Sequence, residues 1–422
     1  MTTRPAAPGL ASVPGACRIG VCAAAALLVG VAPAAAQRWS LDARFSQTLS
    51  AETNRDLDTD GNDPSFGSTT VLGTRIGYET PRARWSLGSS IAIRAFTGGD
   101  DDDDLDVVSP TVGASMSLFG RRWSLANSLS FSRQNATFTQ LGDGISLEES
   151  DIPDGLGADT GDTAVLEDGD ATRTAVSFGS STTFTLTPRN SISFGANLGI
   201  VRFSEEADTL EDSNTYSTSA TFTHRVSQRT ALTLGSSISR STVDDLESTV
   251  STGGSVTVGF QRTVSPRLEI AGNGGVTITR IGEDQPNGFR DTSTTVSGTG
   301  SFGVLYREGE TAFNLSLAQS VRPDADGDIS NVTSLSAGFT TPLTSTQSVS
   351  VTGGLSRSST VSSGDGSETD LVAEIGPTYS LRLTDDWSAS LGYRLRFGND
   401  DNGSAVSNGV FLSVSRPLQL FP

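Results

Sequence analysis

The chain has 422 residues, a formal net charge of −19, 35% hydrophobic residues and a mean hydropathy of −0.17. That hydropathy excludes a helical membrane protein. The acidic balance, in which all 29 basic residues are arginine, argues against a nucleic-acid binder. Short apolar–polar alternation runs nearly from end to end and argues against a disordered chain.

Residues 1–36 have the layout of a secretory signal peptide. Arg4 and Arg18 precede an apolar stretch, 19–31, which is too short to span a bilayer as a permanent helix. Three consecutive alanines then offer a cleavage site. Because both cysteines lie in this segment, we expect the mature domain, 37–422, to contain none.

From Trp39 onward, segments of about ten to fourteen residues alternate apolar with small polar side chains, which is the period-two pattern of strands with one apolar face. Long acidic connections alternate strictly with short turns. Nine long connections and eight turns predict eighteen antiparallel strands, or sixteen if one hairpin is misassigned. The expected long connections are 51–67, 97–107, 134–171, 204–213, 241–249, 281–291, 322–330, 358–369 and 399–407. Both termini then lie on the short-turn side.

The charge is sorted in the same way as the connections. The nine long connections carry 39 of the 48 acidic residues, whereas the turn side is rich in arginine. All four tryptophans open strands on the turn side, as a membrane-interface girdle requires. These are Trp39, Trp85, Trp123 and Trp387.

We therefore predict an all-β fold, a transmembrane antiparallel up-and-down β-barrel with long acidic outer loops and short periplasmic turns. The alternative is a secreted sandwich or solenoid, which has no reason to gather every tryptophan at one end. The predicted location is the outer membrane of a Gram-negative bacterium. At eighteen strands the interior should be wide enough for a water-filled channel.

The longest connection, 134–171, is the third outer loop and carries ten acids and no base. Signal peptide, strand alternation and loop position together resemble the general diffusion porins. The resemblance implies a third loop that folds into the barrel, acids on that loop facing arginines on the wall, and a homotrimer. The chain differs in having eighteen strands rather than sixteen, and the loop lacks a Pro-Glu-Phe-Gly-Gly motif. Folding inward and lying outside in solvent both stay open for this loop, whose candidate constriction acids include Glu148, Glu149, Asp151, Asp154, Asp159 and Asp162.

Two sets of arginines follow from the strand parity. If the tryptophans and aliphatic side chains face lipid, one set lines the pore, where it filters solutes by charge or stiffens the wall. This set is Arg44, Arg75, Arg94, Arg173, Arg225, Arg382, Arg394 and Arg396. The other set lies on the lipid parity at the outer strand ends, as a belt for lipopolysaccharide phosphates, unless a register slip turns it inward. This belt is Arg133, Arg202, Arg240, Arg280 and Arg357.

The acidic loops and the single histidine are the candidate sites for metal binding or catalysis. Asp56, Asp58 and Asp60 match the first half of a calcium loop, but Gly67 stands where the motif needs glutamate, so solvated charge or loosely bound Ca²⁺ or Mg²⁺ is expected rather than a cofactor. His224 lies near a turn on the lipid parity and has no cysteine or histidine partner for catalysis. We expect no enzyme.

The expected function is passive diffusion of small hydrophilic solutes with a preference for cations, because acids crowd the mouth. One alternative is a surface interaction protein or a part of a polysaccharide-export system, and another is a substrate-specific sugar channel. The expected partners are the outer membrane and its lipopolysaccharide, the barrel-assembly machinery and the solutes. No nucleic acid is expected.

Overall fold

A computed structural model gives the fold. It describes residues 38–54, 57, 64–97, 109–135, 172–204, 212–244, 249–284, 290–323, 329–360, 369–400 and 403–421. The signal-peptide segment lies outside these residues, so its assignment stays a prediction. The described residues include no helix that is long and apolar enough to cross a membrane.

Eighteen strands form one antiparallel sheet. The first nine are β1 (Arg38–Thr53), β2 (Pro64–Glu79), β3 (Ala83–Thr97), β4 (Ser109–Phe119), β5 (Trp123–Asn135), β6 (Thr172–Thr187), β7 (Asn190–Phe203), β8 (Asp212–Arg225) and β9 (Thr230–Asp244). The others are β10 (Thr249–Ser265), β11 (Leu268–Asp284), β12 (Arg290–Glu308), β13 (Thr311–Pro323), β14 (Ile329–Thr344), β15 (Gln347–Thr360), β16 (Thr369–Arg382), β17 (Ser388–Asp400) and β18 (Gly403–Phe421).

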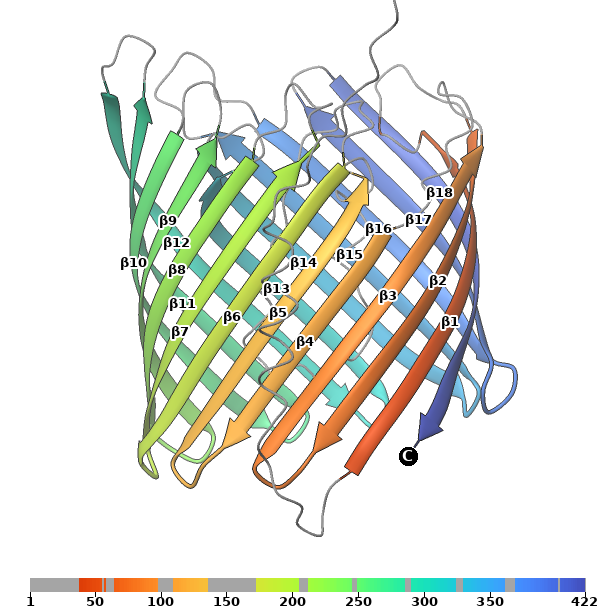
Figure 1. Cartoon of the computed structure of the whole chain (residues 1–422), viewed down its shortest axis with the longest axis horizontal. Helices are drawn as coiled ribbons and strands as arrows, with labels where there is room; N and C mark the ends of the chain where they lie inside the picture. Colours follow the sequence, from red (N-terminus) through yellow and green to blue (C-terminus); the bar gives the residue numbers. More distant parts are fainter. Residues whose placement is uncertain are drawn as a thin grey trace, which may run out of the picture. The chain divides into compact units, whose positions relative to one another are not determined.

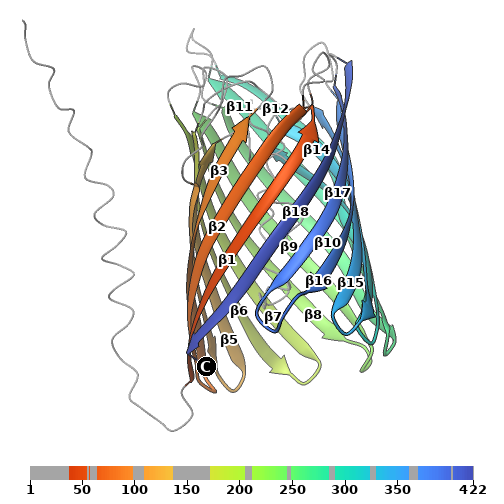
Figure 2. The same ribbon diagram turned by 90° about the vertical axis from the view of Figure 1, so that its right-hand side faces the viewer.

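The sheet closes on itself, because β1 pairs with both β2 and β18. Every strand therefore has two hydrogen-bonded neighbours and no edge is left open, which is the condition for a sheet to stand in lipid. The tilted strands form the wall of the barrel, and β1 begins at the same end at which β18 finishes (Figures 1 and 2). The predicted strand number and all-β barrel class are confirmed.

The strands reach further into the acidic connections than the sequence pattern indicates. The expected connection 399–407 is mostly strand, because β17 runs to Asp400 and β18 starts at Gly403. Glu52 and Asp212 also lie in strands rather than in the expected connections. The strands extend this far because polar side chains do not end a strand when one face of the sheet is wet.

Pro417 lies inside β18 without breaking the barrel. It pairs with Arg44 on β1, whereas the ladder between β17 and β18 ends at Ser415. Proline has no N–H to donate and is tolerated where a strand lacks a partner on one side. The closing strand therefore continues beyond Pro417 to Phe421.

The two faces of the wall differ in composition. On one parity, β11 carries Val276 and Ile278, each 54% exposed, and β12 carries Val296, 65% exposed. The other parity carries mainly serine, threonine and glycine, whose hydroxyls pair across strands. Examples are Ser130 with Ser177 at 2.6 Å, Ser237 with Ser255 at 2.6 Å and Ser86 with Ser115 at 2.8 Å. Because the sheet is closed, the apolar face meets lipid and the hydroxyl face lines a wet lumen.

Candidate functional site

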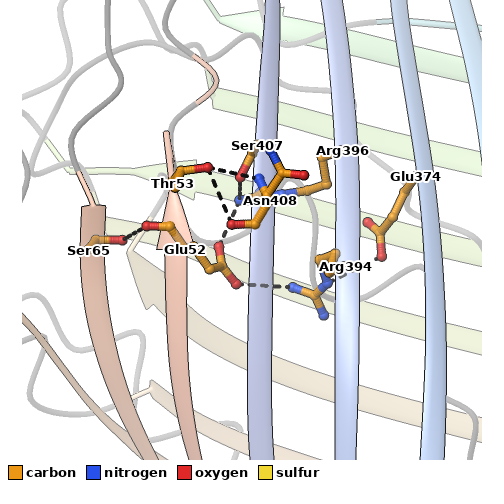
Figure 3. Close-up of polar contacts among 8 residues, drawn as sticks. All are labelled: Glu52, Thr53, Ser65, Glu374, Arg394, Arg396, Ser407 and Asn408. Atoms are coloured by element: carbon orange, nitrogen blue, oxygen red, sulfur yellow. Dashed lines mark hydrogen bonds and ion pairs between the residues drawn. The ribbon is translucent and has the colours of Figure 1, made fainter.

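Four charged side chains from three strands meet on the lumen face beside the junction of β1 and β18. We call Glu52, Glu374, Arg394 and Arg396 the seam cluster (Figure 3). Arg396 Nη2 lies 2.8 Å from Glu52 Oε2, and Arg394 lies 3.8 Å from Glu52 Oε1 and 3.4 Å from Glu374 Oε1. Two carboxylates and two guanidinium groups therefore balance in charge.

The register of the strands brings these groups together. Glu52 on β1 and Arg394 on β17 both pair with Gly409 on β18, so the three share one row across the seam. A Cβ at Gly409 would lie 2.8 Å from the Glu52 side chain. Glycine at this position thus lets the Glu52 carboxylate pass over β18 and reach the arginines.

Two of the four charged side chains in the cluster are largely buried. The Arg396 side chain is only 4% exposed and the Glu52 side chain is 17% exposed. Arg396 also donates to Ser407 Oγ at 3.2 Å, and Ser65 Oγ donates to the Glu52 backbone carbonyl at 3.4 Å. A charge held out of water needs partners of this kind, because removal from water is costly.

Asn54 and Leu57 follow β1, and Leu57 packs against β17 two residues beyond Arg396. Leu57 is buried, and its Cδ1 would lie 3.4 Å from a Cβ at Gly398 on β17. Asn54 and Leu57 both adopt positive φ angles, 51° and 58°, which non-glycine residues rarely do. The Leu57 N–H donates to the Asn54 carbonyl at 3.3 Å. Leu57 therefore packs against the lumen face of β17.

An aromatic ring lies beside the cluster. Phe411 on β18 faces the lumen, and its ring occupies the space above Gly392 on β17. The Arg394 guanidinium lies 5.9 Å from the centre of this ring, within the range of a cation–π contact. Among the inward side chains that the structure describes, only Phe119, Phe203 and Phe411 are aromatic.

The register places all eight arginines proposed to line the pore on the lumen parity. Arg394, Arg396, Arg44, Arg75 and Arg94 gather on β17 and β1–β3. The other three lie apart, at the outer end of β6 and the periplasmic ends of β8 and β16; they are Arg173, Arg225 and Arg382. Away from the strand ends, the charged lumen side chains are therefore concentrated on one side of the barrel, opposite a wall rich in hydroxyls.

The acidic half of the cluster was not singled out as a site from the sequence. The predicted connection 51–67 contains Glu52, and Glu374 lies within the alternating pattern of a predicted strand. The strand parity could have identified both acids as facing the lumen, since Glu52 shares the inward parity of Arg44 on the same strand. Glu374 shares the parity of Arg382 on β16.

The tryptophans lie near the short turns. The rings of Trp39, Tyr78 and Trp85 form one cluster on the lipid face, with centroids 4.8 to 5.8 Å apart. Trp387 lies just before β17, under the Arg416 guanidinium at 5.3 Å. Arg416 in turn lies 3.6 Å from Asp386. Aromatic rings at this level fit the proposed periplasmic girdle, which Trp123 continues on β5.

Two of the proposed sites fall outside the described residues. These are the candidate calcium ligands Asp56, Asp58 and Asp60, and the candidate constriction acids between residues 148 and 162. Within the described part of the chain, no group of three or more histidine, cysteine, aspartate or glutamate side chains could hold a metal ion.

Closure, an apolar outer face and a polar inner face together define a β-barrel of the type found in the outer membrane of Gram-negative bacteria. No family model matches the chain, and no curated protein matches it. Its structure is similar to three Pseudomonas aeruginosa proteins. OpdK, solved with vanillate, is 12% identical, with a TM-score of 0.46 over 90% of this chain and 98% of OpdK. OpdL is 11% identical, with a TM-score of 0.44 over 92% of this chain and 100% of OpdL. OprD is 11% identical, with a TM-score of 0.42 over 91% and 96%.

Proposed function

We propose that this channel passes small hydrophilic solutes by passive diffusion and selects among them at the charged side of its wall. The lumen face carries the proposal. It is lined by serine, threonine and glycine around most of the barrel, and the charges within the wall gather on β16–β17 and β1–β3. Small polar side chains leave room for water in a barrel of eighteen strands.

The first experiment is single-channel recording of the refolded protein in a planar bilayer under a salt gradient. We expect stable conductance steps with a reversal potential that favours cations, because most of the acidic residues lie in or beside the outer connections. Silence from folded, heat-modifiable protein would contradict an open channel. A reversal potential that favours anions would contradict the cation preference alone.

The acidic mouth favours a cationic group on the solute, and the arginines of the lumen wall favour a carboxylate as well. Arg75 is exposed to the lumen and makes no ion pair or hydrogen bond among the described residues. A free guanidinium binds carboxylates well. An acidic mouth followed by an arginine-bearing wall suits small solutes that carry both a cationic group and a carboxylate, of which amino acids are the simplest. A sugar channel receives less support, because the described lumen lacks a line of aromatic side chains.

Ornithine and putrescine test this requirement, because they differ only in the carboxylate. We expect Arg75→Gln to reduce the ratio of ornithine to putrescine flux in proteoliposomes by roughly two- to fivefold, as for one solvent-exposed charged contact. Arg262→Gln removes the same charge from the lipid face of β10 and should leave the ratio unchanged. An equal effect of both substitutions would contradict selection at the wall.

A further inference from the structure

The lipid face carries a repeated arrangement near the outer rim. Thr252 on β10 pairs with Arg240 on β9 and with Arg280 on β11, so the three residues share one outward row. Thr174 on β6 pairs in the same way with Arg133 and Arg202. Two arginines thus flank a threonine hydroxyl in both places, about 10 Å apart at the backbone because two strand spacings separate them.

The height of the row places it at a membrane interface. Arg240 lies ten residues beyond Thr230, where β9 begins at its periplasmic turn. At about 3.3 Å per residue and a tilt of about 40°, this gives a rise of roughly 25 Å, which is the height of the apolar band of such barrels. The guanidinium groups therefore lie level with lipid headgroups rather than acyl chains.

The two rows differ in how many hydrogen bonds and ion pairs their arginines already make with the protein itself. Arg202 is held by Asp212 at 3.3 Å, by Asn214 Oδ1 at 2.8 Å and by two backbone carbonyls. Arg240 and Arg280 are exposed and make no hydrogen bond or ion pair among the described residues. Arg133 is exposed as well, so the row on β9–β11 is the one in which both guanidinium groups are open to an external anion.

The next outward row toward the periplasm is apolar. Ile238, Gly254, Ile278 and Val296 lie side by side on β9–β12. Ile238 and Val296 are each 65% exposed, which makes them the most exposed large apolar side chains in the described wall. A ligand on this surface thus meets two cations and a hydroxyl above and branched aliphatic side chains below.

We propose that Arg240, Thr252 and Arg280 bind the phosphorylated headgroup of an outer-leaflet lipid, the lipid A part of lipopolysaccharide. Lipid A carries a phosphate at each end of a disaccharide, with acyl chains beneath it. Guanidinium groups form strong charge-assisted hydrogen bonds with phosphate oxygens. The contact gives an otherwise acidic protein a local anchor in an anionic leaflet, and it does not depend on what the lumen transports.

The test is a native mass spectrometry titration of the refolded full chain with bisphosphorylated lipid A. We expect Arg240→Gln with Arg280→Gln to weaken binding at least tenfold, since one charge-assisted hydrogen bond accounts for about a factor of ten or more. Each single variant should be intermediate. Lipid A that lacks both phosphates should bind the unmodified protein as weakly as the double variant does.

Arg262→Gln is the matched control, because Arg262 lies on the same lipid face of β10 but at the periplasmic end. It should bind lipid A within about twofold of the unmodified protein, a difference of under 0.5 kcal/mol. Heat-modifiable migration on gels checks that each variant is folded. Unchanged binding by the double variant, an equal loss in Arg262→Gln, or displacement of lipid A by excess inorganic phosphate would overturn the proposal.

Discussion

Replacing Glu52 with glutamine is expected to destabilise the barrel by about 3 kcal/mol, the cost of removing one partner from a buried ion pair. The substitution removes the carboxylate that lies 2.8 Å from Arg396, whose side chain is only 4% exposed. It also removes the negative group 3.8 Å from Arg394. Urea unfolding of the refolded protein in lipid vesicles, followed by tryptophan fluorescence, measures the loss.

Glu79→Gln is the control for that measurement. Glu79 lies 2.7 Å from Arg84, but their side chains are 53% and 64% exposed. Exposed ion pairs contribute less than about 1 kcal/mol, so this variant should unfold close to the unmodified protein. A double variant that also carries Arg396→Gln should regain part of the stability, because the buried charge that lost its Glu52 partner is gone. If Glu52→Gln cost no more than Glu79→Gln, the seam cluster would not stabilise closure.

The second large effect concerns neighbouring residues at the centre of β11. Val276 is 54% exposed on the lipid face, whereas Thr277 is on the lumen parity. An arginine that faces lipid at the bilayer midplane costs about 2–4 kcal/mol. We therefore expect Val276→Arg to destabilise the barrel by that amount in the same urea experiment.

Thr277→Arg should leave the stability nearly unchanged, because its guanidinium would lie in a hydrated lumen. It should instead shift the reversal potential toward anions, since it adds a positive charge to the wall. The two variants differ only in the face on which the same side chain is placed. Equal destabilisation by both would contradict a wet lumen, and a larger loss from Thr277→Arg would invert the assignment of the two faces.

Much of the architecture follows from local pattern. Alternation along each strand separates residues such as Val276 and Thr277 onto opposite faces, and this holds whichever strands pair. The strict succession of long and short connections likewise determines the strand number and places both ends of the barrel domain on one side. The turn-side tryptophans can be recognised for the same reason, since each precedes or opens a strand.

The strand boundaries and the seam cluster could not be obtained in this way. Polarity marked 399–407 as a connection, yet backbone pairing between β17 and β18 continues through most of it, because the lumen face tolerates polar side chains. Glu52 and Arg396 are 344 residues apart in the chain. They meet only because the sheet closes and sets β1 beside β18, with Gly409 leaving space between them.

By itself, then, the sequence determined the barrel, its two faces and the parity of its arginines, because these depend on a period of two residues within each strand. The tertiary structure alone decided which charges are neighbours. Contacts across a closed sheet depend on the register of strands that are distant in sequence, and that register follows from closure as a whole. The pairing of Glu52 with Arg396 and the alignment of Arg240 with Arg280 across Thr252 are both of this kind.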